Sequence, residues 1–507
     1  MKTNNFLKKY SVDSKIHKYT FWILLLIAMI IKYAYYGLTY FPLKDDHAMY
    51  GTFNLLTVKK SMVTFKTYTT RPIAALLDTC IIAKLWDHSG IVLFFIILLH
   101  FSSCYLIYIV LKQNQVKIGI LALIIFTLFP LGSEASYWIA ASSRIIFGIF
   151  FACLSFYFLM KYIEHDKSIN KYSWLYILAF AVTNLISMGF YEQIIAFSFL
   201  VTLVLIIVNY KKLKYRWVGI IPIINFLAIA VFYMYFSSTG NVASRGQIVR
   251  NNFIVHTKDV FKEIIKLFTV KPGKMIKNGF IHAMQLIFTD KAFIFLILVA
   301  GISIAMGIIY SKEKVSFSQK NTIIKLIIGI FLFIIPFGPF FLLETVIIGY
   351  RNAFVSFIGL GLVIESFTSL IFTKKNFPML RGIICSAIIF CFIMVNVSEV
   401  YNYKKVYDID KEIVTNIQNL RSNIDEPSGR TVVFNTKPIY FTPTSEHFSN
   451  CTSSDWALSG AMYSIVGQLE GMGYYYPVKD GSIIPLSIEE LKQVTLIGMN
   501  KEREMNL

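Results

Sequence analysis

Long apolar stretches recur along most of this 507-residue chain and constrain its fold more than any other feature. A helix needs about 20 mainly apolar residues to cross the hydrocarbon core of a bilayer. Such stretches lie at residues 20–36, 89–111, 118–132, 138–160, 173–189, 190–209, 217–236, 292–310, 323–343, 347–371 and 382–399. With 56% hydrophobic residues overall, the chain is predicted to be an α-helical polytopic membrane protein with about 11 transmembrane helices.

The connections between these stretches alternate in charge. Basic residues occur in every second connection, whereas the short connections 132–137, 189–193 and 344–350 hold no Lys or Arg and one Glu each. This asymmetry is typical of the positive-inside rule. It predicts a cytoplasmic N-terminus, an uncleaved first helix and an extracytoplasmic C-terminal segment. The bias toward Lys, Ile, Phe and Asn and the many short loops favour a bacterial cytoplasmic (inner) membrane.

The net charge of +20, from 49 basic and 29 acidic residues, has a topological explanation. The basic residues are divided among short loops instead of sharing one soluble face with interleaved aromatics, so nucleic acid is not an expected partner. Anionic membrane lipids are the expected partners of these loops. The six cysteines form no disulfide framework or metal-ligand pattern.

The chain divides into a predicted transmembrane body, residues 1–399, and a predicted extracytoplasmic domain, residues 400–507. Extracytoplasmic loops at 37–88 and 237–291 each contain an amphipathic pattern, near 73–85 and 260–268, that predicts a helix lying on the membrane. In the C-terminal domain, a helix near 408–421, strand-like runs at 431–435 and 438–441 and a helix around 456–469 predict a small α/β fold.

Charged residues next to the apolar stretches converge on one predicted side. Under this topology Glu134 and Glu192 lie at the outer ends of helices, beside the acidic pair Asp45 and Asp46. Arg144 and Arg351 lie two turns or fewer into the outer halves of theirs. One interpretation is that these residues pair with one another only as interface residues, as we expect for Glu344 and Glu365. The other is an outward-facing polar cavity with a chemical function.

Several motifs together resemble the GT-C superfamily of membrane glycosyltransferases, which includes protein O-mannosyltransferases. They are the acidic pair in the first outer loop, Arg71-Pro72-Ile73, the segment Phe-Pro-Leu-Gly-Ser-Glu-Ala-Ser-Tyr-Trp-Ile-Ala-Ala-Ser-Ser-Arg at 129–144, Met-Gly-Phe-Tyr-Glu-Gln at 188–193 and Gly-Tyr-Arg-Asn at 349–352. The 188–193 motif lacks the family's usual basic residue, and the late arginine motif lacks its Pro-Ser. The resemblance covers roughly residues 20–200, with a weaker match near 350.

The resemblance implies transfer of a sugar from a polyprenyl-phosphate carrier to an acceptor on the outer face of the membrane. Such a reaction needs a carboxylate base for the acceptor hydroxyl and a cation for the departing phosphate. Asp45 or Asp46 is the expected base, with inversion at the anomeric carbon. A divalent cation, Mg²⁺ or Mn²⁺, held by these two carboxylates is an open alternative. The remaining expected residues are Arg71, Arg144 and Arg351 at the donor phosphate, and Lys44, His47, Glu134, Trp138 and Glu192 in the substrate cavity.

A serotype-converting O-antigen glucosyltransferase is the most specific interpretation, with a glycan or glycolipid of the cell envelope as acceptor. Enzymes that modify teichoic acid or lipid A fit almost as well. The alternatives from other classes are an O-antigen polymerase, a flippase-type transporter of lipid or polysaccharide, and a purely structural membrane protein. Charges gathered at the outer surface, and not at the midplane, favour the enzyme over a transporter.

Overall fold

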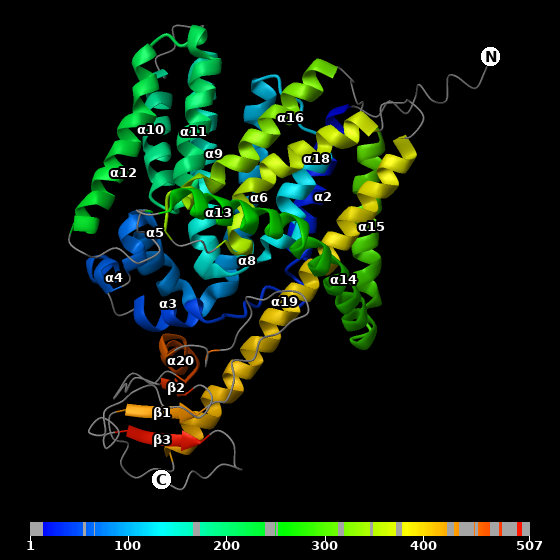
Figure 1. Cartoon of the computed structure of the whole chain (residues 1–507). Coiled ribbons are helices and arrows are strands. Elements are labelled where there is room, and N and C mark those ends of the chain that lie inside the picture. The colour runs from blue at the N-terminus through cyan, green and yellow to red at the C-terminus, as the bar shows by residue number, and fades with distance from the viewer. Residues whose placement is uncertain are drawn as a thin grey trace.

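Helices dominate the chain (Figure 1). The computed structural model describes residues 14–53, 57–64, 66–165, 173–238, 249, 252–312, 319–344, 348–371, 378–422, 430–434, 451, 455–466, 476–478 and 494–498. Each of the eleven predicted apolar stretches contains a helix. These helices are α2 (Ser14–Ile31), α6 (Ser89–Gln113), α7 (Ile120–Leu128), α9 (Ile139–His165), α10 (Ser173–Met188), α11 (Glu192–Val208), α12 (Ile221–Ser238), α15 (Phe293–Lys312), α16 (Gln319–Ile334), α18 (Phe357–Ile371) and α19 (Pro378–Ser422).

Seven helical segments of the described chain are long and apolar enough to cross a membrane. They are Pro72–Gln113, Ile139–Glu164, Arg216–Phe236, Phe293–Lys312, Asn321–Phe341, Tyr350–Ile371 and Pro378–Asn416, and three shorter apolar helices lie at Tyr19–Ile31, Ser173–Met188 and Glu192–Val208. The prediction of a helical, multi-pass membrane protein is confirmed. The count of eleven crossings stays a prediction, because α7 has only nine residues and a helix of that length is about 14 Å long.

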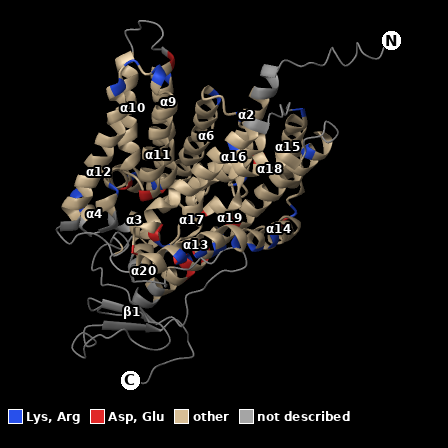
Figure 2. Cartoon of the chain, turned by 45° about the horizontal axis from the view of Figure 1, so that its top comes forward, with Lys and Arg blue, Asp and Glu red and all other residues tan. Residues whose placement is uncertain are grey.

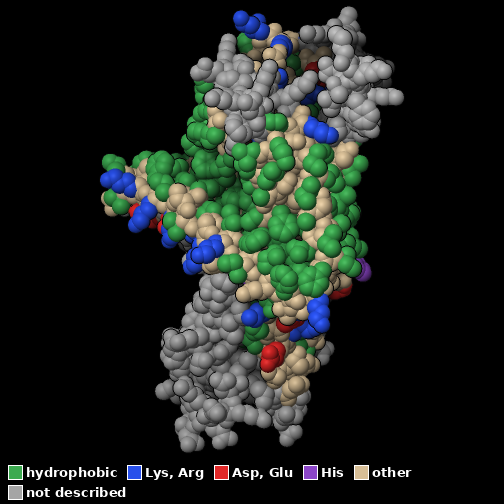
Figure 3. Space-filling view, turned by 90° about the vertical axis from the view of Figure 1, so that its right-hand side faces the viewer, with side chains coloured by type: hydrophobic (Ala, Val, Ile, Leu, Met, Phe, Trp, Pro, Cys, Tyr) green, Lys and Arg blue, Asp and Glu red, His purple; other side chains and the backbone are tan. Residues whose placement is uncertain are grey.

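The surface and the charge distribution fit a membrane-spanning body. Lys and Arg lie near the upper ends of α9 and α10 (Figure 2), beside connections predicted to be basic, although α10 itself contains neither residue. Hydrophobic side chains cover much of the flank seen in the space-filling view (Figure 3). The direction in which the chain crosses the membrane stays a prediction.

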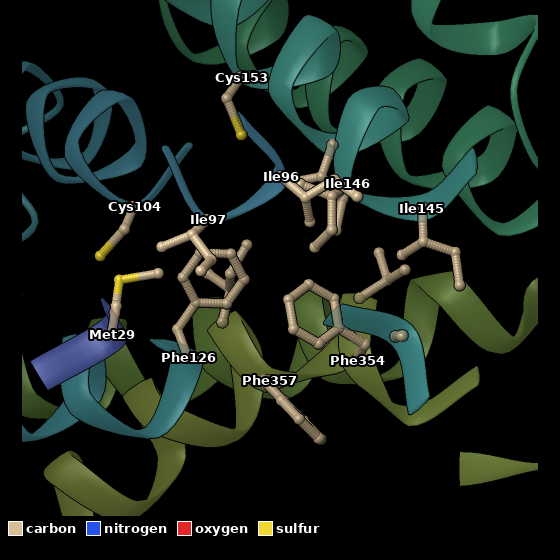
Figure 4. Close-up of a cluster of buried hydrophobic side chains, with 14 of the residues drawn as sticks. Met29, Ile96, Ile97, Cys104, Phe126, Ile145, Ile146, Cys153, Phe354 and Phe357 are labelled. Atoms are coloured by element: carbon tan, nitrogen blue, oxygen red, sulfur yellow. The ribbon is translucent and has the colours of Figure 1, made fainter. Parts of the chain in front are cut away.

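A single large hydrophobic core joins the helices of the body. Figure 4 shows its centre, where side chains from α2, α6, α7 and α9 meet Phe354 and Phe357. Phe354 belongs to η9 (Phe354–Ser356), which follows the short helix α17 (Tyr350–Ala353) and leads into α18. The imidazole of His100 in α6 packs edge-on against Phe126 and Phe354. The start of α18 is therefore fixed from several sides.

The short helix α7 is closed at both ends by charged side chains. The Glu365 carboxylate of α18 accepts hydrogen bonds from the backbone N–H groups of Gly119 and Ala122, at 2.8 and 3.2 Å. The Lys32 ammonium, buried at the end of α2, donates to the carbonyl of Thr127 at 2.8 Å. A carboxylate at the N-terminus and an ammonium at the C-terminus both interact favourably with the helix dipole. Beyond α7 the chain turns through η4 (Pro130–Gly132) and α8 (Ser133–Ser136) into α9.

Short helices fill the first predicted loop, at the lower left of the helical body in Figure 1. They are α3 (Asp45–Phe53), α4 (Val58–Thr64), η1 (Lys66–Thr70), α5 (Pro72–Leu77), η2 (Asp78–Ile82) and η3 (Ala83–His88). The helix predicted near 73–85 is present as α5, η2 and η3, and together with α6 these form one continuous helical segment, Pro72–Gln113.

Two helices form in the second predicted loop. They are α13 (Phe253–Thr269) and α14 (Lys271–Thr289), and α13 crosses the front of the body in Figure 1. Met275, Gly279, Ala283 and Ile287 form the buried face of α14, which packs against α19. The amphipathic helix predicted near 260–268 is present as part of α13. Other short turns of the body are η5 (Tyr210–Lys212), η6 (Arg216–Ile220) and η8 (Ile335–Phe341).

One 45-residue helix, α19, joins the body to the C-terminal segment. The predicted boundary at residue 400 lies inside this helix, and the helix predicted near 408–421 is its end. The described parts beyond it are β1 (Arg430–Phe434), α20 (Asp455–Ala461), η11 (Met462–Val466), β2 (Tyr476–Val478) and β3 (Val494–Gly498). The strands pair in parallel in the order β2-β1-β3, with Val432 opposite both Tyr476 and Leu496. The strand expected at 438–441 lies outside the described residues.

The close packing of α15 on α19 predicts a stability difference between two glycines of α15. A Cβ at Gly307 would lie 2.5 Å from the carbonyl oxygen of Gly382 in α19, so Gly307→Ala must push the helices apart. We expect a loss of about 1–3 kcal/mol, seen as a lower melting temperature of the purified chain in detergent. Gly301→Ala is the control, because open space surrounds that position. Equal melting temperatures for the two variants would contradict this packing.

Candidate functional site

Three arginine–carboxylate pairs lie where α5, α8, α9, α11 and α17 begin. In the first, the Arg71 guanidinium donates to Glu192 through Nε at 3.0 Å and Nη2 at 2.9 Å. The Thr70 hydroxyl donates to the same carboxylate at 2.7 Å. Arg71 also stacks on the Tyr191 ring, 4.3 Å from its centroid. A two-pronged pair of this kind fixes the orientation of both side chains.

The second pair joins Arg144 of α9 to Asp78 at the start of η2. Arg144 Nε donates to Asp78 Oδ2 at 3.1 Å. The Tyr68 hydroxyl donates to the same oxygen at 2.6 Å and accepts from Arg144 Nη2 at 2.9 Å. Because these three side chains are joined by hydrogen bonds, Arg144 is held firmly against the first loop. Burial and the neighbouring Asp78 raise the pKa of the Tyr68 hydroxyl well above its ordinary value, although Arg144 opposes the shift.

The third pair, Arg351 with Glu134, is looser. The backbone N–H of Arg351 donates to Glu134 Oε2 at 3.1 Å, but the guanidinium Nε lies 3.8 Å from Oε1. That separation is too long for a hydrogen bond. The Arg351 side chain is 26% exposed, against 16% for Arg71 and 15% for Arg144. Within the described chain the guanidinium has the Trp138 ring on one side, 5.5 Å from the centroid, and no side-chain hydrogen bond.

Hydrogen bonds connect the first and third pairs. The Asn352 amide, next to Arg351, donates to the Tyr191 hydroxyl at 3.0 Å, and Tyr191 carries the Arg71 guanidinium on its ring. Gln193, next to Glu192, donates to the carbonyls of Asn352 and Pro336 at 3.0 and 3.1 Å. Four of the predicted site residues, Arg71, Glu134, Glu192 and Arg351, are thus brought together in one connected cluster.

The Asp45 carboxylate faces this cluster from the first turn of α3. It interacts electrostatically with both Arg144 and Arg351. The residue is half-buried, and no hydrogen bond or ion pair to another described residue engages its carboxylate. A carboxylate near two guanidinium groups but bonded to neither can accept a proton from a bound molecule.

Asp46, the next residue, has a different environment. It is fully buried, and its carboxylate accepts from the hydroxyl of Tyr40, the N–H of Leu43 at 3.0 Å and the N–H of Ala140 at 2.9 Å. Ala140 lies in the first turn of α9, so Asp46 fastens α3 to that helix. Burial raises the pKa of Asp46 to about 7, against the opposing effect of its three donors. The predicted role of Asp46 as a base for substrate does not fit, because both oxygens are already bonded and buried.

His47 does not lie where the sequence predicted it, in the substrate cavity. His47 is fully buried, with Nδ1 2.7 Å from the Ser464 hydroxyl and Nε2 3.5 Å from Asp410. Both nitrogens therefore face the C-terminal segment, and His47 links α3 to α19 and η11. Lys44 is half-buried and turns the chain into α3 with a φ of 31°, in the left-handed region. The predicted Glu134, Glu192 and Trp138 do belong to the cluster.

A divalent cation held by both Asp45 and Asp46 does not fit this geometry. Mg²⁺ and Mn²⁺ need several oxygen ligands directed at one point. Both Asp46 oxygens already accept protein hydrogen bonds, and the described residues hold no group of three or more His, Cys, Asp or Glu that could bind a metal.

Three residues of the site were missed in the sequence. Asp78 and Tyr68 hold Arg144, and Lys271 lies over the ring of Tyr350, 4.9 Å from its centroid, beside Arg351. A signal for Asp78 existed, because an acidic residue within an otherwise apolar run needs a partner. Tyr68 and Lys271 lie in ordinary loop sequence and gave no comparable signal.

Comparison with known proteins gives no relative: no protein-family model, no curated protein and no solved structure matches the chain. The function is therefore inferred from the chemistry of the cluster.

Substitutions of the two adjacent aspartates should differ strongly in their effect on stability. Asp46→Ala leaves buried donors without an acceptor, and we expect a loss of about 2–4 kcal/mol in the free energy of unfolding. Asp45→Ala removes a carboxylate that no hydrogen bond engages, so its melting temperature should match that of the wild type. Thermal unfolding of the purified variants in detergent distinguishes them. Comparable destabilisation by both substitutions would show that Asp45 is also structural.

Proposed function

We propose that this protein is an inverting membrane glycosyltransferase that moves a sugar from a polyprenyl-phosphate carrier to a glycan of the cell envelope. The observation that carries the proposal is the half-buried Asp45 carboxylate beside Arg144 and Arg351, with Arg351 held by no side-chain hydrogen bond in the described chain. An unbonded base next to an available guanidinium is what this reaction requires.

Asp45 acts as the general base. An acceptor hydroxyl donates its proton to the Asp45 carboxylate as its oxygen attacks the anomeric carbon. The bond from that carbon to the phosphate oxygen breaks on the opposite face, and its electrons leave with the polyprenyl phosphate. The glycosidic bond forms with inversion, and the products are the extended glycan, the carrier phosphate and protonated Asp45.

Arg351 binds the donor phosphate. Its guanidinium is the most exposed of the three arginines, and its link to Glu134 is an ion pair of 3.8 Å. A guanidinium can offer two parallel N–H donors to a phosphate, and it is weakly hydrated compared with a lysine ammonium. The negative charge on the phosphate oxygens increases as the sugar leaves, so a cation at this position stabilises the transition state more than the ground state. Arg71 and Arg144 preserve the shape of the site through Glu192 and Asp78.

An apolar groove next to this cluster suits the isoprenoid chain of the donor. It has a volume of about 410 Å³ and is lined entirely by hydrophobic side chains from α13, α16, η8 and α18. Figure 3 shows hydrophobic side chains in a hollow above the projecting arm that α13 forms. The groove reaches Phe337, next to Pro336, whose carbonyl is bridged by Gln193 to Asn352. A carrier chain in the groove would therefore place its phosphate near Arg351.

The finer assignments extend the same proposal. We place the protein in a bacterial cytoplasmic membrane with the Asp45 cluster and the C-terminal α/β domain on the outer side, and we interpret the body as a GT-C-like fold with eleven crossings. A hexose such as glucose and an O-antigen acceptor are the preferred substrates. Packing of α20 against α3 supports a role for the C-terminal segment near the acceptor, since a Cβ on Gly460 would lie 2.6 Å from the backbone of Ala48.

The first test compares envelope glycans from bacteria producing wild-type protein, Asp45→Asn or no protein. We expect a hexose-sized mass increment in the polysaccharide only with the wild type, because the amide of the Asp45→Asn variant cannot take the proton. Loss of general-base catalysis costs about 10²- to 10⁴-fold in rate. Arg351→Lys should also be slow, since an ammonium cannot form the two-pronged phosphate contact.

Asp259→Asn is the matched control for charge, because Asp259 is exposed on α13 and has no hydrogen bond or ion pair to the described residues. It should keep the increment. Equal amounts of each variant in the membrane, measured by immunoblot, exclude an effect of folding. Identical glycans in all strains, with unchanged chain lengths, would refute transfer in that host and favour the flippase-type transporter.

The groove predicts a dependence on carrier length. Ile330 lines the groove, whereas Ile327, three residues earlier on α16, is exposed and does not. We expect Ile330→Trp to slow transfer from a long polyprenyl-phosphate donor in vitro while sparing a donor with a short chain. Ile327→Trp should affect neither donor. If Ile330→Trp slowed both donors equally, the groove would not be the site of the carrier chain.

A further inference from the structure

A second cavity lies at the far end of α18 from Arg351. It has a volume of about 240 Å³. Its walls are the connection after α6, the start of α16 and the ends of α15 and α18, and they include Gln115, Lys117, Ile324, Lys325 and Glu365. Arg351 and Glu365 are fourteen residues apart in one helical segment, which corresponds to about 20 Å. The cavity is therefore separate from the cluster described above.

The acidic residue in this cavity, Glu365, already accepts several hydrogen bonds from the protein. Glu365 accepts from the backbone N–H groups of Gly119 and Ala122 and from Lys325 Nζ at 2.5 Å. Position 119 must be glycine for this contact, since a Cβ there would lie 2.7 Å from the carboxylate. A carboxylate that closes a helix N-terminus and pairs with a lysine has little capacity left for a cation.

The rest of the lining favours an anion. Lys325 is neutralised by Glu365, and Lys117 adds a further positive charge to the cavity wall. Arg381 brings another positive charge close by, because it donates to the carbonyl of Tyr310 at 2.7 Å, and Tyr310 lines the cavity. Asn321 and Gln115 contribute amide groups that can donate to an oxygen.

An apolar surface adjoins the same cavity. Ile324 lines it and is 42% exposed, and Ile327, one turn further along α16, is 61% exposed. Isoleucines this exposed on a helix long and apolar enough to cross a membrane face lipid chains. A ligand with an anionic head in the cavity and a hydrocarbon chain along α16 would match both surfaces at once.

We propose that this cavity binds a phosphate group, supplied by the head of an anionic phospholipid whose acyl chains lie along α16. Basic pockets between membrane helices on the cytoplasmic side are suited to such head groups. By the positive-inside prediction this end of the body is cytoplasmic, where the inner leaflet supplies anionic lipid. The site does not depend on the glycosyltransferase proposal.

The test measures lipid retention by the full-length protein after delipidation in detergent. Native mass spectrometry would compare phosphatidylglycerol with phosphatidylcholine for wild type, Lys117→Gln and Lys112→Gln. Lys112 is the matched control, because it is an exposed lysine at the same end that does not line the cavity. We expect wild type and Lys112→Gln to prefer phosphatidylglycerol, and Lys117→Gln to bind it about fivefold more weakly. Lys325 is left unchanged because its removal would strand the Glu365 carboxylate.

Competition between inorganic phosphate and phosphatidylglycerol determines whether the phosphate comes from a lipid or from solution. If inorganic phosphate displaces no phosphatidylglycerol and does not raise the melting temperature, the ligand is the lipid. If millimolar inorganic phosphate alone raises the melting temperature of the wild type but not of Lys117→Gln, the site takes free phosphate. Equal retention of phosphatidylglycerol by Lys117→Gln and Lys112→Gln, with no effect of phosphate, would overturn the proposal.

Discussion

Inside a bilayer no water is available to satisfy a backbone end, and this constraint governs the helix on which the rest of the body depends. The nine-residue helix α7 is too short to carry its own ends into water on both sides. Glu365 supplies the acceptor at its N-terminus, and Lys32 supplies a donor at its C-terminus. Asn396 of α19 adds a second donor there, to the carbonyl of Leu128 at 3.0 Å. Three other helices, α2, α18 and α19, thus close α7.

A short α7 lets the following segment lie within the body. The chain leaves α7 at Phe129 and passes through η4 and α8, all of whose residues are buried. Glu134 in α8 can therefore meet the start of α17, where its carboxylate accepts from the backbone of Arg351. A Cβ on Gly132 would lie 2.7 Å from the rings of Phe354 and Phe357, which shows how closely this segment packs on the helix that carries Arg351. The caps of α7 thus help to position the candidate site.

The sequence predicted the helices well and the direction of single side chains poorly. Hydropathy identified the eleven apolar helices, but the polar half of α19 beyond residue 400 carries no hydropathy signal. Charge placement brought the three arginines to one end, but the pairing of Arg144 with Asp78 depends on how η2 packs against α9 and could not be read from the sequence. Successive residues on a helix point about 100° apart. Asp45 therefore faces the arginines, Asp46 faces α9 and His47 faces the C-terminal segment. These three directions depend on how α3 packs against its neighbours, which the sequence alone does not give.

The unequal strength of the three arginine pairs determines where a ligand can bind. Removing Glu192 from Arg71, or Asp78 from Arg144, would break short charge-assisted hydrogen bonds, and the loss is largest at Asp78, which is fully buried. Arg351 has no such bonds to lose, since its guanidinium lies 3.8 Å from Glu134. An incoming phosphate therefore gains its full interaction with Arg351 without first breaking another, while the tighter pairs keep the surrounding helices in place. A similar division holds at the far end of α18, where Glu365 and Lys325 satisfy each other and the charge of Lys117 favours an anion in the cavity.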